Sequence, residues 1–307
     1  MNLFERILEA KKRKIKVSPV HANRASEIGK CERYLCYCRL NWQDRQPHSP
    51  EVELIFEEGR RQELAVIQDL REAGFKIEEM QQSLSWSQLN LYGHIDGKIL
   101  IDDKWLPFEI KSASPYVYPS FRDAESIRNH RYYYARAYFS QIQAYLLLTN
   151  EPQYLLIFKN RSSGEIKEIL IDLDYEFAEE LLKKVERINA HVESKTYPDV
   201  TECPDNRCPF LHICLPGRDF GPGTGIVIDA ELEAMLERRA ETKISRNEYE
   251  ELDEEIKAKF QGHEGVIECG RFEIKTTWTP EKVYTEAMVP KPRAAFWKII
   301  ISEKKNE

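Results

Sequence analysis

The sequence predicts an α/β protein in which a mixed sheet is flanked by helices and followed by a C-terminal α+β appendage. Short runs of alternating hydrophobicity, bounded by turn residues, fill residues 75–110, and long helical patterns stand on either side of them. A glycine-rich stretch at 217–225 then separates this region from acidic helical stretches and a second set of strand-like runs. These two observations predict the fold class.

The individual elements follow from local patterns. Residues 1–50 hold a basic run and three cysteines without strand alternation, and we expect them to be mainly helical. Ser49 and Pro50 suit the N-cap and first turn of a helix over 51–73, which should end at Gly74. After it we expect a β-meander over 75–110, a long helix over 121–148, a hairpin with strands 154–159 and 166–171, and a helix over 175–192.

This order predicts four parts of the chain. They are an N-terminal helical segment (1–50), a core (51–195), a cysteine-rich loop (196–216) and a C-terminal helical pair with a small sheet (226–307).

Composition narrows the class of protein. The 307 residues are 42% hydrophobic and 32% charged, which is typical of a soluble globular chain, and the formal net charge of -7 disfavours a protein that coats nucleic acid non-specifically. No apolar stretch is long enough to cross a bilayer, and residues 1–16 are too charged for a secretory signal. We therefore expect a cytoplasmic protein without membrane contact, whose seven cysteines are metal-bound or buried rather than disulfide-bonded.

Two acids and a lysine lie at the ends of neighbouring strand-like runs. Asp96 follows one run, and Glu109 and Lys111 close the next, so a meander should bring the two carboxylates together. With the backbone carbonyl between Glu109 and Lys111 they would form an all-oxygen site of the kind that Mg²⁺ or Mn²⁺ prefers. The lysine would orient a water and stabilise charge on a phosphate, although acid and lysine pairs also occur as ordinary surface ion pairs.

Glu63 is a third acid with an unusual position. At about 100° per residue it falls in the middle of the apolar face of the helix predicted over 51–73. A carboxylate there is costly unless a metal or a partner compensates it, so Glu63 is a candidate metal ligand; a salt bridge between the N-terminal segment and the core is the alternative. The apolar residues of that face are Val52, Phe56, Gly59, Val66, Ile67 and Leu70.

Three segments, 93–96, 109–111 and 141–145, resemble the G-x-x-D, E-h-K and Q-h-x-x-Y motifs of the RecB-like PD-(D/E)XK nucleases. The resemblance covers about residues 25–216, keeps the order of the motifs and implies a restriction-endonuclease-like core. Many members carry histidine where Glu63 stands here, but other branches use an acid. The resemblance implies the following roles: Asp96, Glu109 and Glu63 as metal ligands, Ile110 as a carbonyl ligand, Lys111 as the catalytic lysine, and Gln141 and Tyr145 as helpers that position the lysine or the DNA.

A second metal centre is indicated by the cysteines. Cys203, Cys208 and Cys214 have the spacing C-x4-C-x5-C, which leaves a tetrahedral site one ligand short. The resemblance to RecB-like nucleases with an iron-sulfur staple implies that Cys31, in a C-x-R motif, is the fourth ligand of a 4Fe-4S cluster. Such a cluster would clamp the beginning of the chain to the end of the nuclease domain, as a cross-link does.

Alternatives to this cluster remain open. Zinc could replace it, because tetrahedral sulfur sites suit either metal, and His212 could then stand in for one cysteine. Cys36 or Cys38 could take the place of Cys31, whereas Cys269 is expected to be a buried apolar thiol.

The arginines and tyrosines between residues 111 and 136 suit a path for single-stranded DNA, but rings packed in the core with solvated arginines are equally expected.

The resemblance implies a Mg²⁺- or Mn²⁺-dependent DNA exonuclease that acts on single strands or duplex ends. Two kinds of enzyme look similar: the CRISPR-associated exonuclease of spacer acquisition, with adaptation proteins as partners, and the phage recombination exonuclease, with an annealing recombinase as partner. The alternative class is a catalytically silent nuclease-like module for DNA binding or scaffolding, and a third is a zinc-stabilised interaction protein. A binding module has no physical need for Asp96, Glu109 and Lys111 together.

Overall fold

A computed structural model describes residues 2–199, 208–216, 224–226, 230–241, 246–270, 272–280 and 296–303. The chain divides into two compact units, Met1–Leu215 and Pro216–Glu307. None of the described helices combines the length and the apolar character needed to cross a membrane.

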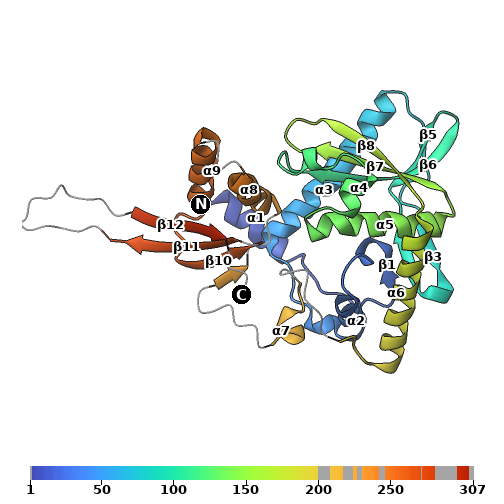
Figure 1. Ribbon diagram of the computed structural model, residues 1–307, viewed down its shortest axis with the longest axis horizontal. Helices are drawn as coiled ribbons and strands as arrows, with labels where there is room; N and C mark the ends of the chain where they lie inside the picture. The colour runs from blue at the N-terminus through green and yellow to red at the C-terminus, as the bar shows by residue number, and fades with distance from the viewer. Residues whose placement is uncertain are drawn as a thin grey trace, which may run out of the picture. The chain divides into compact units, whose positions relative to one another are not determined.

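The first unit is built on a mixed five-stranded sheet, as predicted (Figure 1). Only β6 and β7 run parallel, and the other neighbouring pairs are antiparallel. In sheet order the strands are β2 (Ile77–Glu78), β5 (Gly97–Ile101), β6 (Lys104–Ala113), β7 (Gln153–Asn160) and β8 (Ile166–Asp172).

The prediction of one continuous meander over 75–110 is wrong. β3 (Ser83–Trp86) and β4 (Leu91–His94) leave the main sheet and form a small separate one, in which β1 (Asn23–Arg24) runs parallel to β4. The N-terminal segment supplies this third strand and is held there because Asn23 N donates to the carbonyl of Asn90 at 2.8 Å. The division matters because the link between the two sheets, from β4 to β5, carries Asp96.

Helix α3 (Pro50–Glu72) covers one face of the main sheet. It begins as predicted, with the Ser49 side chain accepting a hydrogen bond from Val52 N. Its second half supplies Val66 and Ile67 to the buried cluster on the sheet, whereas Phe56 in the first half is 49% exposed, so the predicted apolar face is only partly used. The sheet members of that cluster are Ile99, Phe108, Ile110, Leu155 and Ile157.

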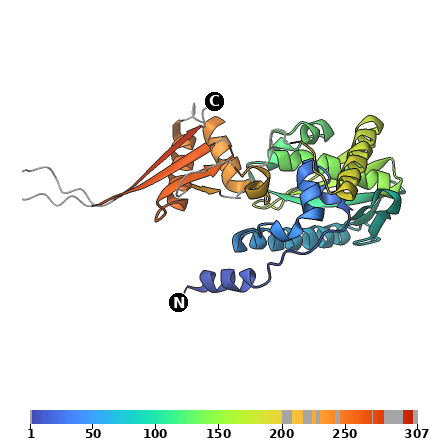
Figure 2. The ribbon, with the colours of Figure 1, turned by 90° about the horizontal axis from the view of Figure 1, so that it is seen from below.

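The long helix predicted over 121–148 is divided into α4 (Ala124–Arg128) and α5 (Tyr133–Thr149). A capping box of Asp123 with Ser126 starts α4. Between the two helices His130 is buried, and its Nδ1 accepts a hydrogen bond from Tyr132 N, which turns the chain before α5 begins. Helix α5 lies on the face of the sheet opposite α3, with α6 (Tyr175–Ser194) beside it (Figure 2).

The remaining helices of this unit belong to its N-terminal and cysteine-containing segments. α1 (Leu3–Lys12) lies along α3 and is joined to it by an ion pair between Lys11 and Glu57. α2 (Glu32–Leu40) packs on α6, and α7 (Leu211–Cys214) is a single turn. Short 3₁₀ turns lie at Ala25–Glu27, Trp42–Asp44, Ser87–Leu89 and Tyr118–Ser120.

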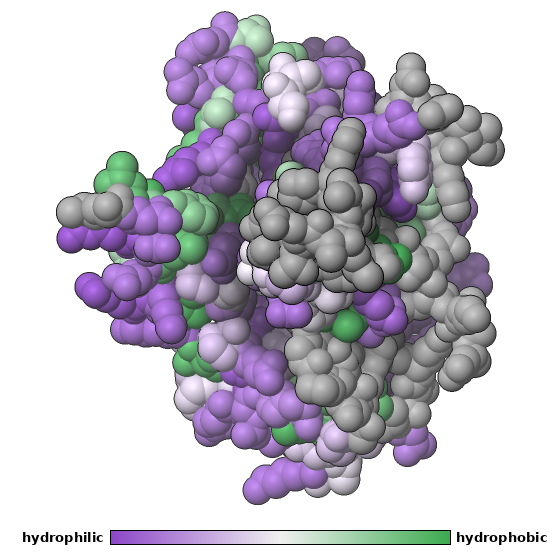
Figure 3. Space-filling model, turned by 90° about the vertical axis from the view of Figure 1, so that its left-hand side faces the viewer, coloured by the Kyte–Doolittle hydropathy of each residue, from purple (hydrophilic) through white to green (hydrophobic). Residues whose placement is uncertain are grey.

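In the second unit a helical pair accompanies a four-stranded sheet of order β12-β11-β10-β9. Buried side chains of α8 and α9, such as Met235 and Ile256, and of β11, such as Ile274, form its core. On the molecular face drawn in Figure 3, hydrophilic residues predominate among those described and apolar areas are small and scattered. The elements are β9 (Thr224–Ile226), α8 (Ala230–Glu241), α9 (Arg246–Lys259), β10 (Gly265–Cys269), β11 (Phe272–Thr279) and β12 (Phe296–Glu303).

Candidate active site

Two buried carboxylates lie side by side where β4 passes into β5. The register of β5 with β6 sets Gly97 opposite Phe108, which brings the preceding residue, Asp96, beside Glu109. Both side chains are buried, and the backbone N–H of Ile110 donates to Asp96 Oδ2 at 2.8 Å. The pairing that the strand pattern predicts is therefore present.

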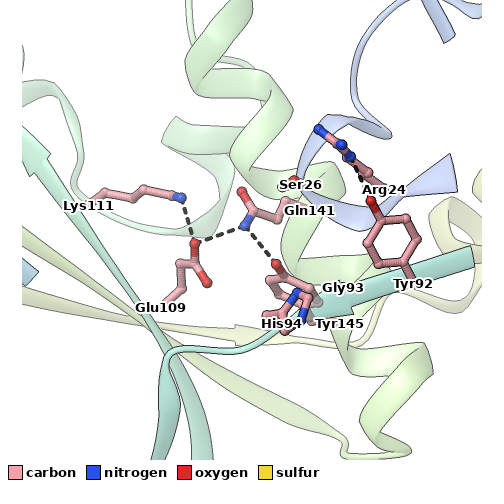
Figure 4. Close-up of a pocket in the computed structure, with 9 residues that line it drawn as sticks. All are labelled: Arg24, Ser26, Tyr92, Gly93, His94, Glu109, Lys111, Gln141 and Tyr145. Carbon is pink, nitrogen blue, oxygen red and sulfur yellow. Dashed lines mark hydrogen bonds and ion pairs between the residues drawn. The ribbon is translucent and has the colours of Figure 1, made fainter. Parts of the chain in front are cut away.

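A chain of polar contacts leads from the sheet into helix α5 (Figure 4). Lys111 Nζ lies 2.6 Å from Glu109 Oε1, and Gln141 Nε2 donates to the same oxygen at 2.9 Å. The Gln141 amide also donates to the Tyr145 hydroxyl at 3.2 Å. Gln141 and Tyr145 are four residues apart in α5 and so face the sheet together. All three motifs of the sequence thus meet at Glu109 and its neighbours.

Gly93, the glycine of the G-x-x-D motif, is required for a steric reason. A Cβ atom at Gly93 would lie 2.5 Å from Cε1 of Tyr145 and 2.9 Å from the Cβ of Ala25. Such distances are far inside van der Waals contact, so only glycine lets the Tyr145 ring approach strand β4 this closely.

The acids and the lysine shift one another's protonation. Burial, and then the carboxylates of Glu109 and Glu63, raise the pKa of Asp96 to about 8. Burial alone would lower the pKa of Lys111, but the Glu109 carboxylate, with smaller contributions from Tyr138 and Asp96, raises it, so the ammonium group stays protonated. Its Nζ also lies 5.2 Å from the centre of the Tyr138 ring, which favours the cation further.

The chemistry of this site fits a divalent cation. Glu109 Oε2 is buried and has no hydrogen-bond partner among the described residues, which leaves one acceptor unsatisfied. The available donors are carboxylate oxygens, the ligands that hard cations prefer. In the described part of the chain, however, no three side chains of His, Cys, Asp or Glu lie close enough together to form a metal-binding group. The acids are neighbours, but they do not form a closed ligand set.

Glu63 approaches this site from helix α3. Its carboxylate accepts a hydrogen bond from Gln81 Nε2 at 2.8 Å, and the same nitrogen lies 3.3 Å from Asp96 Oδ1. Burial, followed by the Glu109 charge, raises the pKa of Glu63. The structure therefore gives Glu63 an amide partner shared with Asp96, where the alternative prediction was a salt bridge to the N-terminal segment.

The pocket beside Glu109 contains residues that the sequence did not indicate. It has a volume of about 380 Å³, and Arg24, Ser26, Tyr92 and His94 line it together with motif residues (Figure 4). Arg24 Nε donates to the Tyr92 hydroxyl at 2.7 Å. These residues come from β1, the turn after it and β4, and a two-residue strand carries no periodic signal by which it could have been found. The motif residues in its wall are Gly93, Glu109, Lys111, Gln141 and Tyr145.

The cysteine segment packs on the N-terminal helix α2. Cys31 is the N-cap of α2, and its sulfur accepts a hydrogen bond from Tyr34 N at 3.3 Å. From the same helix Arg33 Nε donates to the Cys214 sulfur at 3.3 Å, and the buried Phe210 ring lies against Tyr34. The predicted approach of the two segments is therefore present, whereas Cys203 lies outside the described residues.

The other thiols differ from these in burial. Burial raises the pKa of Cys36 to about 11 and that of Cys38 to about 12, so both thiols keep their protons at neutral pH. Cys269 is buried, as predicted for an apolar thiol, and His212 is exposed.

The rings between Lys111 and α5 belong mainly to the core. Tyr118, Phe121 and Tyr132 are buried, and Phe121 stacks on Phe158 with ring centres 4.0 Å apart. Arg128 Nη1 lies 2.8 Å from Asp174 Oδ2. For these three rings the core interpretation is confirmed, because buried rings cannot stack on DNA bases; for the half-buried Tyr116, Tyr133 and Tyr134 the path for single-stranded DNA stays a prediction.

No protein-family model and no curated protein matches the sequence. Among solved structures, the protein SSO0001 is 15% identical with a TM-score of 0.38, over 70% of this chain and 97% of that one. An alkaline exonuclease, LHK-Exo from Laribacter hongkongensis, is 14% identical with a TM-score of 0.40, over 62% of this chain and 93% of that one. LHK-Exo in complex with dAMP gives the same identity and coverage and a TM-score of 0.37.

Proposed function

We propose that the protein is a DNA exonuclease of the PD-(D/E)XK type that depends on Mg²⁺ or Mn²⁺ and uses water as the nucleophile. The observation that carries the proposal is the meeting of Asp96, Glu109 and Lys111 beside a pocket, with Gln141 on α5 donating to Glu109 and to the Tyr145 hydroxyl. Burying two carboxylates together costs stability, which favours a functional role over a purely structural one.

Each residue has a role that follows from its contacts. Asp96 and Glu109, with Glu63 and the Ile110 carbonyl, would hold the divalent cation, which when bound supplies Lewis acidity to the phosphate and to a water. Lys111 remains charged and can orient the attacking water or stabilise negative charge on the phosphate. The Gln141 amide fixes Glu109 Oε1 and leaves Oε2 available.

The pocket also favours a nucleic-acid substrate. The guanidinium of Arg24 lies in the wall of the pocket that holds Glu109 and Lys111, at a place suited to a second phosphate of the same strand. We propose DNA ends, single-stranded or duplex, as the substrate. A role in CRISPR spacer acquisition or in phage-type recombination stays a prediction of the resemblance.

The test is digestion of single- and double-stranded DNA labelled at either end, with Mg²⁺, with Mn²⁺ and with a chelator. Lys111→Ala should lower the rate by at least about 100-fold, since it removes the charge next to the reacting phosphate. Lys104→Ala is the matched control, because Lys104 is an exposed lysine at the start of the same strand, β6. Equal cleavage by the wild type and Lys111→Ala would refute the proposal.

A catalytically silent DNA-binding module is the second candidate. It would bind the same DNA without cleaving it under any of these conditions, and Lys111→Ala would then change affinity only. The two candidates are separated by measuring binding and product formation on one preparation.

We further propose that Cys31, Cys203, Cys208 and Cys214 bind a 4Fe-4S cluster, with zinc as the rival metal. The packing of Arg33 against Cys214 and of Phe210 against α2 supports this, because it brings the segments that carry Cys31 and Cys214 together. Protein purified anaerobically should contain iron and acid-labile sulfide, and Cys214→Ser should lose both while Cys269→Ser retains them. Zinc in place of iron would contradict the iron-sulfur cluster but would still support a metal that cross-links the two segments.

A further inference from the structure

Gln81 occupies an unusual position in the loop between β2 and β3. Its φ is +54°, and that of Glu79, two residues earlier, is +50°. The left-handed region is unfavourable for a residue with a Cβ atom and persists where surrounding contacts over-determine it. Neither residue is glycine or asparagine, so contacts of the loop must hold this conformation.

The loop is fastened directly to the residue that it approaches. Gln81 N donates to the carbonyl of Asp96 at 3.3 Å, and Ile95 N donates to the carbonyl of Gln82 at 3.2 Å. The intervening Met80 packs against the core cluster under the sheet. The backbone of Gln81 is therefore fixed beside Asp96, and its side chain points back across the site.

The amide of Gln81 stands between two carboxylates. Its Nε2 is 2.8 Å from Glu63 Oε1 and 3.3 Å from Asp96 Oδ1. A Mg²⁺ ion bound to either oxygen would lie about 2.1 Å from it, closer than the amide nitrogen, so a cation held by both acids would compete with the amide for the same two oxygens. The two N–H donors of the amide partly offset the repulsion between the acids.

We propose that Gln81 is a placeholder in the metal site: its amide donates to Glu63 and Asp96 in the metal-free protein and must withdraw when a divalent cation binds. The proposal rests on the proposed function, because it takes these two acids as metal ligands. Gln81 therefore lowers the affinity for the cation while it stabilises the empty site.

Calorimetric titration with MgCl₂ and MnCl₂ tests the sign of this effect. Gln81→Ala should bind the cation roughly five- to tenfold more tightly than the wild type, because the hydrogen bonds of the amide to the two acids no longer have to be broken; tenfold corresponds to about 1.4 kcal/mol. Gln81→Asn suits the left-handed backbone but is one methylene shorter, and it should behave in the same direction. With a chelator present, both variants should melt below the wild type.

Gln82→Ala is the matched control, since Gln82 is the neighbouring exposed glutamine and only its backbone joins the loop to Ile95. It should leave the affinity unchanged. Weaker binding by Gln81→Ala would overturn the proposal and make the amide a ligand through its oxygen, and unchanged binding would remove Gln81 from the site. If the wild type and Gln81→Ala both bind no cation, the proposed function fails as well, so the two failures are distinguishable.

Discussion

Replacing Asp96 with asparagine measures how much the burial of this carboxyl group lowers the free energy of unfolding. Burial, with the charges of Glu109 and Glu63, raises the pKa of Asp96 from 3.8 to about 8. In the unfolded chain this group ionises near pH 4, whereas in the folded, metal-free protein it keeps its proton up to about pH 8. The contribution of protonated Asp96 to the free energy of unfolding is therefore fully present below about pH 4. It is lost progressively as the pH rises to about 8, because only the unfolded chain releases the proton in this range.

The size of this loss of stability follows from the size of the pKa shift of Asp96. At about 1.4 kcal/mol per pKa unit, the penalty approaches an upper limit of roughly 6 kcal/mol at pH 8. Water that reaches the site reduces it, and we expect about 2–3 kcal/mol. Asparagine carries no charge, and its oxygen can still accept from Ile110 N, so Asp96→Asn should be more stable than the wild type by this amount at pH 8 in chelator.

Urea unfolding of both proteins at about pH 5 and about pH 8 measures the difference. The gain at pH 5 should be less than half of that at pH 8. Added Mg²⁺ should stabilise the wild type and leave Asp96→Asn unchanged, because ligand binding stabilises only the state that binds. A variant less stable than the wild type at pH 8, or a difference that does not change with pH, would refute the electrostatic reasoning.

Three further substitutions test other parts of the site. Gly93→Ala should lower the free energy of unfolding by about 1–3 kcal/mol and reduce activity, because the new Cβ displaces the Tyr145 ring; denaturant unfolding and turnover measure the two effects. Arg24→Ala should weaken DNA binding and reduce the slope of log affinity against log salt by about 0.7–0.9, measured by titration at several salt concentrations; an unchanged slope would exclude a phosphate contact. Gln141→Ala frees Glu109 to rotate and should lower kcat on the order of 10- to 100-fold with little change in KM, whereas an effect on KM alone would contradict a positioning role.

Much of the candidate site could be predicted because local rules place it. Neighbouring strands joined by a tight turn must pair, so Asp96 had to approach Glu109, and a separation of four residues in a helix puts Gln141 and Tyr145 on one face. The turn at Asp102 and Asp103 could also be predicted from the sequence. In the structure both residues have positive φ, as a two-residue hairpin connection of type I′ requires.

The other features depend on contacts between distant parts of the chain. Nothing near Arg24 in the sequence indicates that a two-residue strand will pair with β4 and turn Arg24 into the pocket. The helix predicted over 121–148 reads as continuous, because its break before α5 depends on the burial of His130, which is a tertiary effect; the Asp123 cap that starts α4 is a local signal. Glu63 was recognised from the face of its helix, but its amide partner Gln81 belongs to a loop without periodicity.

The acids of the candidate site and the residue that holds Glu109 come from different elements of the fold. Asp96 lies on the link between two sheets, Glu63 on the helix that covers one face of the main sheet, and the Gln141 that holds Glu109 on the helix that covers the other. A cation bound by these acids would join α3, the sheet and α5 at one point, so the free energy of metal binding would add to the stability of the elements that carry the proposed catalytic residues.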